Sequence, residues 1–172
     1  MILHSNHNRG FTLIELMIVV VIIGVLTALA IGSYSGVRDR ALGAEARLQC
    51  NAIAKCIEAL GADTGQWPGH CPAGRSCYDG ETLDGEANEV WVLEFPRSGL
   101  LTNDPRCPYP NWNGPYYNEF IKDPWGNDYF FDADYQIDGK TYAVVGSFGP
   151  NGVGRNIYDD DDIYVIISTA RD

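Results

Sequence analysis

The first strong pattern in the chain is a run of 21 residues, Phe11 to Ile31, that is apolar except for Thr12, Thr27 and Glu15. About 20 consecutive apolar residues suffice to cross a bilayer as a helix. Residues 11–32 are therefore predicted to form a transmembrane and assembly helix. A carboxylate costs about 2.5–3.5 kcal/mol at the bilayer centre and somewhat less near its edge, so we expect Glu15 to have a partner that compensates its charge.

The helical pattern continues beyond this run, but with a single apolar face. Apolar residues recur at spacings of three and four, and charged residues fill the other faces, which is typical of an amphipathic helix. This helix is predicted over residues 33–65, with its end at Gly61 or Gly65 ahead of Trp67-Pro68. Its apolar stripe consists of Leu42, Ala46, Cys50, Ile53, Ile57 and Leu60.

The second half of the chain carries strand patterns. Residues 128–134, 141–147 and 163–168 are predicted strands, and Asp138-Gly139 is a hairpin signal between the first two. Residues 66–127 are predicted to be an irregular, cysteine-containing loop region, in which residues 90–95 form a short strand or a buried helical turn. The sequence thus predicts an α+β fold, in which a long N-terminal helix packs on a small antiparallel sheet formed by residues 128–172.

The segment Asp123-Pro124-Trp125-Gly126-Asn127 has the composition of a turn. A buried tryptophan removes about 150–250 Å² from water. We therefore expect Trp125 to anchor this turn in the core.

The charged residues are distributed unevenly along the chain. Arg9 and Glu15 are the only charged residues among the first 32, so the rest of the chain carries the whole net charge of −11. Because phosphate binding needs basic patches, this excess of acid argues against a nucleic-acid partner. The positive-inside rule places residues 1–10 in the cytoplasm and the acidic domain outside.

The small residue Gly10 precedes the apolar run, whereas a secretory signal has its cut site after that run. Cleavage between Gly10 and Phe11 would leave the apolar helix on the mature protein and free an α-amine on Phe11, with an ordinary pKa of about 8. Such an amine is a suitable counter-ion for Glu15, most readily between neighbouring subunits that are staggered along an axis. Glu15 and Phe11 are therefore predicted assembly residues.

Five cysteines fit an oxidising compartment, and structural disulfides are favoured over a metal because no CxxC motif is present. Cys50 and Cys56 lie about 9 Å apart along a predicted helix, too far for a disulfide between them. Each would have to pair with Cys71, Cys77 or Cys107, although Cys71 and Cys77 could also staple their own loop. The odd number leaves at least one thiol free or intermolecular.

The N-terminal motif, Gly10-Phe11-Thr12-Leu13-Ile14-Glu15-Leu16 followed by about fifteen apolar residues, resembles the type IV prepilin class. That class comprises type IV pilins and the pseudopilins of type II secretion. The resemblance implies that a membrane prepilin peptidase and methyltransferase cleaves after Gly10 and methylates the Phe11 nitrogen. It also implies that Glu15 helps to register subunits in a helical filament.

Three later passages resemble the major, G-type pseudopilin of type II secretion: N-W-N-G-P-Y at 111–116, K-D-P-W-G-N-D-Y at 122–129, and S-F-G-P-N-G at 147–152 with the aspartates before Ile163. The chain departs from that family in a longer, cysteine-containing segment at 71–95. The resemblance implies a single-pass inner-membrane subunit with a periplasmic C-terminal domain. Its implied partners are further copies of itself in a helical homopolymer, the minor pseudopilins and the inner-membrane assembly platform. The alternative is a major type IV pilin that forms a long surface fibre for adhesion, motility or electron transport.

In that family the loop between the last two strands binds calcium, and the residues here agree with such a site. Calcium takes six to eight hard oxygen ligands, and four consecutive aspartates would repel one another without a cation. The candidate ligands are Asp160, Asp161, Asp162, Asn151 and the Phe148 carbonyl, with Asp159 less certain. The alternative is a solvated acidic turn.

No set of residues suggests catalysis. His70 is the only histidine outside the leader, and the chain shows no Ser/His/Asp arrangement. The acidic pairs stand beside glycines, which suits a cation better than acid–base chemistry. The sequence therefore predicts a structural subunit and no enzyme.

Overall fold

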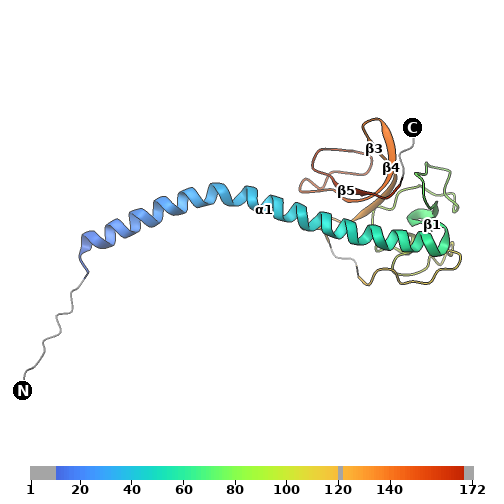
Figure 1. Ribbon diagram of the computed structural model, residues 1–172, viewed down its shortest axis with the longest axis horizontal. Coiled ribbons are helices and arrows are strands. Elements are labelled where there is room, and N and C mark those ends of the chain that lie inside the picture. The colour runs from blue at the N-terminus through green and yellow to red at the C-terminus, as the bar shows by residue number, and fades with distance from the viewer. Residues whose placement is uncertain (1–10, 120–121, 169–172) are drawn as a thin grey trace, which may run out of the picture. The chain divides into compact units, whose positions relative to one another are not determined.

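The computed structural model describes residues 11–119 and 122–168, without the side chains of residues 30–35. The chain forms two compact units, Met1–Ala41 and Leu42–Asp172. One continuous helix, α1 (Leu13–Thr64, 52 residues), runs through both (Figure 1). The leader, residues 1–10, lies outside the described residues, so the structure does not test the predicted cleavage site.

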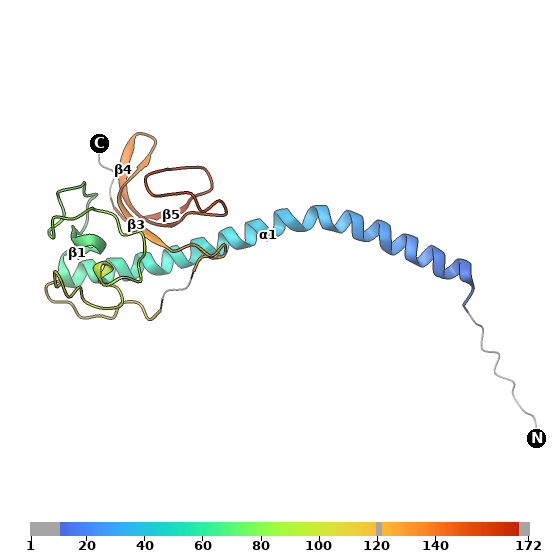
Figure 2. The same ribbon diagram turned by 180° about the vertical axis from the view of Figure 1, so that it is seen from behind.

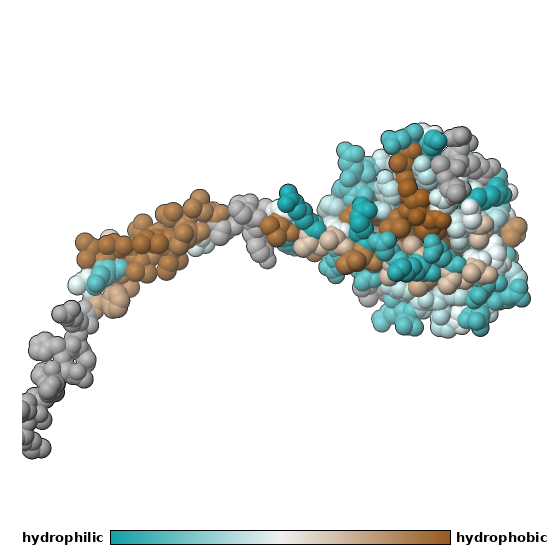
Figure 3. Space-filling model, in the orientation of Figure 1, coloured by the Kyte–Doolittle hydropathy of each residue, from teal (hydrophilic) through white to brown (hydrophobic). Residues whose placement is uncertain are grey.

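The first unit exposes an apolar helix surface. Its large apolar side chains between Leu13 and Leu29 are all solvent-exposed, from 46% for Val19 to 78% for Leu13, and they form a nearly continuous apolar covering (Figure 3). Within the described part of the chain, no helix combines the length and the apolar character that a membrane crossing requires. The predicted transmembrane segment, residues 11–32, includes residues 30–32, whose side chains are not described.

In the second unit, α1 buries the predicted apolar stripe. Ala46, Cys50, Ile53, Ile57 and Leu60 are all fully buried, and Leu42 is half-buried. The helix ends at Thr64 because Gly65 takes a left-handed conformation (φ 72°), which terminates helices readily. Of the two predicted ends, Gly65 is the one observed.

The sheet has three antiparallel strands in the order β3-β4-β5: β3 (Phe130–Ile137), β4 (Lys140–Ser147) and β5 (Ile163–Ile166). Asp138 and Gly139 both have positive φ (51° and 76°) and join β3 to β4, as a two-residue hairpin turn requires. Side chains on one face of the sheet, including Phe131 and Val145, join the buried face of α1 in the main core. Figures 1 and 2 show the sheet beside the C-terminal part of α1, which confirms the predicted α+β fold.

The segment between helix and sheet contains only short elements. Strands β1 (Gln66–Trp67) and β2 (Cys71–Pro72) pair around the 3₁₀ turn η1 (Pro68–His70), and η2 (Pro96–Ser98) follows. The prediction of a strand or helical turn at residues 90–95 was wrong. Val90 alone forms a bridge, to Phe131. The Leu93 N–H still donates to the Tyr129 carbonyl (3.4 Å), and the chain turns at residues 93 and 94. The residue after Val90, Trp91, packs in a second apolar cluster on Phe130, so residues 90 and 91 contact opposite faces of β3.

The turn at residues 123–127 is anchored by Asp123 and not by Trp125, contrary to the prediction. Trp125 is only half-buried and belongs to neither core cluster. The Asp123 carboxylate is buried. Its Oδ1 accepts hydrogen bonds from the backbone N–H groups of Trp125 (3.0 Å) and Asn127 (2.7 Å). Its Oδ2 accepts one from the Ser147 hydroxyl (2.5 Å), which ties the turn to the end of β4.

Candidate functional site

Glu15 has a partner within its own chain. Its Oε2 atom accepts hydrogen bonds from the backbone N–H (2.9 Å) and the hydroxyl (2.7 Å) of Thr12, and the Thr12 hydroxyl accepts one from the Glu15 N–H (3.3 Å). This reciprocal arrangement is a capping box, which satisfies N–H groups that have no partner at the start of a helix. Sequence reasoning missed it, although Thr-x-x-Glu at the start of an apolar run is its usual signal.

The capping box keeps the Glu15 carboxylate at the exposed tip of the helix. Phe11 is 84% exposed, and Thr12 and Glu15 are exposed as well. The two predicted assembly residues thus stand together at one end of α1, and both are free of tertiary packing within the first unit.

The acidic loop, residues 148–162, joins β4 to β5 and is held at its base by the turn at residues 123–127. The Asn127 amide donates to the Gly149 carbonyl (2.9 Å), and the Gly149 N–H donates to Ser147 (3.1 Å). Gly149 has positive φ (62°) and packs so closely on the other end of the loop that an added Cβ would lie 2.2 Å from the Asp161 carbonyl oxygen. Only glycine fits there, because it lacks that atom and tolerates the backbone angle.

Two carboxylates of this loop converge on one point. The side-chain amide nitrogen of Asn151 donates to Asp159 Oδ2 (2.9 Å) and Asp161 Oδ1 (2.5 Å), and its backbone N–H donates to Asp161 Oδ2 (3.0 Å). Partial desolvation and hydrogen bonding with Asp159 raise the pKa of Asp161. A donor group with partial positive charge therefore lies where the two carboxylates meet.

The other candidate ligands have different surroundings. Asp160 is exposed, and the Phe148 ring stacks on Phe130 (4.5 Å between centroids). Asp162 is buried and accepts a hydrogen bond from the Tyr135 hydroxyl (2.6 Å). Its other oxygen, Oδ1, is buried without a hydrogen-bond partner among the described residues, and burial raises the pKa of this carboxyl. Across residues 11–119 and 122–168, no three Asp, Glu, His or Cys side chains are arranged to hold a metal ion.

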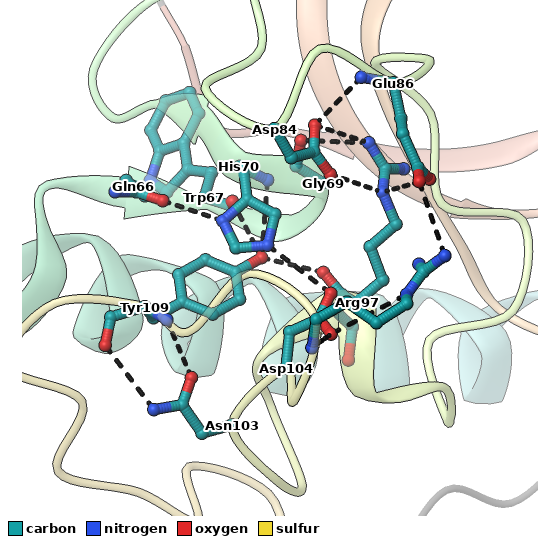
Figure 4. Close-up of polar contacts among 12 residues, drawn as sticks. Gln66, Trp67, Gly69, His70, Asp84, Glu86, Arg97, Asn103, Asp104 and Tyr109 are labelled. Carbon is teal, nitrogen blue, oxygen red and sulfur yellow. Dashed lines mark hydrogen bonds and ion pairs between the residues drawn. The ribbon is translucent and has the colours of Figure 1, made fainter.

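A buried polar network that sequence reasoning did not find lies in the segment between helix and sheet (Figure 4). His70 is buried and its ring stacks on Tyr109 (4.0 Å between centroids), with Nδ1 2.9 Å from Gln66 Oε1 and Nε2 3.6 Å from Asp104 Oδ2. Burial lowers the pKa of His70. The His70 ring is buried among these contacts, so its role is structural: it connects Gln66, Asp104 and Tyr109.

Arg97 forms the other half of this network. Its guanidinium donates to both carboxylate oxygens of Asp84 (2.9 and 3.3 Å) and to three main-chain carbonyls, those of Gly69 (3.2 Å), Ala87 (2.5 Å) and Glu89 (3.1 Å). One side chain thus holds together parts of a segment that has almost no regular secondary structure. No sequence pattern signalled this role, because the partners lie 8 to 28 residues away.

All five cysteines, at 50, 56, 71, 77 and 107, are free thiols in this structure. Cys50, Cys71 and Cys77 are buried, whereas Cys56 and Cys107 are half-buried. The predicted disulfides are therefore not formed here.

Comparison with known proteins places these features in a family. The type II secretion system (T2SS) protein G family matches residues 94–165, and the prokaryotic N-terminal methylation motif matches residues 5–31. The type II secretion system core protein G of Pseudomonas aeruginosa is 33% identical over 159 residues, which cover 91% of this chain and 96% of the relative. The chain belongs to the type II secretion system protein G family.

Further relatives differ in how much of the chain they match. Core protein G of Vibrio cholerae is 29% identical over 87% of this chain and 90% of its own length. A fimbrial protein of Neisseria meningitidis is 40% identical, but only over 63 residues, 37% of each chain. No solved structure matches the chain.

The two family matches cover the functional features unevenly. Residues 5–31 include the Thr12–Glu15 capping box, and residues 94–165 include Arg97, the turn at 123–127 and the acidic loop. Residues 32–93 lie between the two matches, and they contain His70, Asp84 and four of the five cysteines. The N-terminal motif suggests membrane anchoring of the chain.

Proposed function

We propose that the chain is a structural, non-enzymatic subunit of a pseudopilus, a helical filament that serves type II protein secretion. The observation that carries this proposal is the exposed apolar surface of α1 between Leu13 and Leu29, which begins at the Thr12–Glu15 capping box. So large an exposed apolar surface requires cover. In the proposed cycle a lipid bilayer supplies it before assembly, and neighbouring copies supply it afterwards.

The proposed topology puts residues 1–10 in the cytoplasm and the acidic domain in the periplasm. Prepilin peptidase would cut between Gly10 and Phe11, and the enzyme's methyltransferase activity would methylate the new amine. That amine would then pair with Glu15 of a neighbouring copy, which registers the two helices. The minor pseudopilins and the inner-membrane assembly platform are the further proposed partners.

The function can be tested by complementation of a secretion-competent host from which its own protein G gene has been deleted. This chain should restore release of the secreted enzymes. Glu15→Leu should abolish the release, whereas the control Glu58→Gln, at an exposed glutamate farther along the same helix, should not. Full release with Glu15→Leu would refute the assembly role. A long extracellular fibre of this chain in a strain with normal expression would instead support a type IV pilin.

We also propose that the acidic loop binds calcium, with Asp159 and Asp161 as side-chain ligands and with Asn151 as a third. The convergence of the two carboxylates on one point supports this proposal, because calcium prefers hard oxygen donors. The Asn151 amide nitrogen lies at that point, so the side chain would have to turn its Oδ1, which accepts from the Val153 N–H (2.6 Å), toward the ion. Main-chain carbonyls of the glycine-containing loop would complete the set. A bound ion would neutralise the mutual repulsion of the aspartates and lock the loop that joins β4 to β5.

Calcium binding is tested on the full chain in detergent micelles. A chelator should lower the melting temperature, and added calcium should restore it. Asp161→Asn should remove this response, whereas the control Asp138→Asn, in the exposed hairpin turn, should retain it. An unchanged melting temperature in the presence of chelator would argue for a solvated acidic turn instead.

A further inference from the structure

The segment that follows β1 brings two cysteines together in the core. Cys71 lies in β2 and Cys77 follows it by six residues, and both side chains are fully buried. Both belong to the main apolar cluster, beside the buried face of α1. Their backbones are fixed independently of each other, because Cys71 pairs with Trp67 in the β1–β2 ladder and the Cys77 N–H donates to the Ala133 carbonyl of β3 (3.2 Å).

A single residue bridges the two cysteines. The backbone carbonyl of Asn88 accepts a hydrogen bond from the Cys71 thiol (3.7 Å), and the side-chain amide of Asn88 donates to the Cys77 carbonyl (2.6 Å). Asn88 is itself 1% exposed. The two thiols also lie within hydrogen-bonding reach of each other, and this bond lowers the pKa of Cys77. A thiolate is the reactive form of cysteine in disulfide exchange.

The other three cysteines have different surroundings. The Cys50 thiol donates to the carbonyl of Ile163 in β5 (3.7 Å). Cys56 lies in a surface hollow with Tyr116 and Tyr117, and Cys107 is half-buried in the loop after η2. Among the described residues, only Cys71 and Cys77 have a thiol–thiol contact.

We propose that Cys71 and Cys77 form an intramolecular disulfide once the domain has been exported, and that the other three cysteines remain thiols. The oxidant is a protein or small-molecule disulfide of the outer compartment. The thiolate of one of the two cysteines attacks a sulfur of this oxidant to form a mixed disulfide, and the other cysteine then displaces the oxidant's second sulfur. Two S–H bonds of the chain and the S–S bond of the oxidant break, and one S–S bond forms between Cys71 and Cys77. The oxidant takes up two electrons and two protons and leaves as a protein dithiol or as two small-molecule thiols.

The bond closes a loop around residues 72–76, in a segment where β1 and β2 have only two residues each. Small or loop-rich regions with little regular secondary structure commonly depend on such cross-links. Oxidation would take place during folding, before the two thiols are sealed in the core.

Trypsin provides a direct test, because Arg75 lies between the two cysteines. Cleavage gives the peptides 56–75, with Cys56 and Cys71, and 76–97, with Cys77. The full chain is extracted from membranes with N-ethylmaleimide present from lysis onward, then denatured and digested without reductant. We expect the two peptides to stay linked in wild type and equally in Cys56→Ala, with three labelled cysteines per wild-type chain and two per Cys56→Ala chain. Five labelled cysteines, or a link that is lost in Cys56→Ala, would overturn the proposal.

Thermal unfolding in detergent micelles gives a second readout. Dithiothreitol should lower the melting temperature of wild type by about 5–10 °C and should leave Cys71→Ala unchanged. If the two thiols served only for packing, Cys71→Ala would be destabilised and dithiothreitol would have no effect on wild type. The inference rests on the proposed outward placement of the domain, which proteolysis of intact spheroplasts checks separately.

Discussion

We expect the stability of the segment between helix and sheet to depend more on Arg97 than on any other single residue. Its side chain is 13% exposed, and that of its ion-pair partner Asp84 is 7% exposed. In Arg97→Met, the Asp84 carboxylate remains buried without its counter-charge, and three carbonyls lose a donor (Figure 4). Loss of one partner of a buried ion pair typically costs 3–5 kcal/mol. We expect a loss of about 3 kcal/mol, since the exposed edge of the network can take up water.

Arg97→Lys should fall between wild type and Arg97→Met. Lysine keeps the positive charge beside Asp84, but its ammonium group cannot make a bidentate contact with the carboxylate and also donate to three carbonyls. A loss of about 1–2 kcal/mol is expected. Asp84→Asn in the Arg97→Met background should recover part of the lost stability, because it removes the uncompensated charge.

Urea unfolding of the full chain in micelles measures these losses. The four tryptophans lie between residues 67 and 125, so their fluorescence reports on this part of the molecule. With a slope of about 1–3 kcal/mol per molar urea, Arg97→Met should lower the midpoint by about 1–3 M. Arg75→Met is the matched control, because this arginine is 50% exposed and its ion pair with Glu81 is 3.7 Å long. Equal midpoints for the two variants would refute the proposed role of Arg97.

Two further perturbations test the sheet and the acidic loop. Burial raises the pKa of Asp132 to about 8, so the folded state holds a proton that the unfolded state has lost, and stability falls from about pH 4 to pH 8. Asp132→Asn should reduce this loss of stability, which melting temperatures measured between pH 4 and pH 8 would show. An unchanged dependence of melting temperature on pH would contradict the prediction.

Gly149→Ala should lower the free energy of unfolding by more than about 2 kcal/mol, because its Cβ would meet the Asp161 carbonyl. The control Gly126→Ala, with a positive φ but open space, should cost about 1 kcal/mol.

The parts of the fold that follow from local periodicity could be predicted from the sequence. The stripe from Ala46 to Leu60 is buried because residues three and four apart share one face of a helix. The Asp138-Gly139 turn forms because both residues tolerate positive φ. Each of these features depends on neighbours within a few positions, so a single sequence contains the information.

The polar contacts could not be predicted in this way, because they depend on distant residues. His70 meets Asp104 and Tyr109 only after the chain has turned back through η1 and η2. In the acidic loop, four consecutive aspartates look equivalent in the sequence. Their directions differ because Tyr135 draws Asp162 inward while Asn151 gathers Asp159 and Asp161. The prediction that Trp125 anchors its turn in the core was wrong for a related reason. The size of a side chain does not indicate which side of a turn faces the core.

The capping box changes the physical meaning of Glu15. Its carboxylate is already compensated by Thr12 and by the positive end of the helix dipole, so an isolated subunit carries no unsatisfied charge at this position. A cap of this kind contributes about 1 kcal/mol. In the proposed filament, an ion pair between Glu15 and the Phe11 amine of a neighbouring copy would have to contribute more than this, after the cost of desolvating both charges. Assembly would then exchange the internal hydrogen bonds of Glu15 for the intermolecular ion pair.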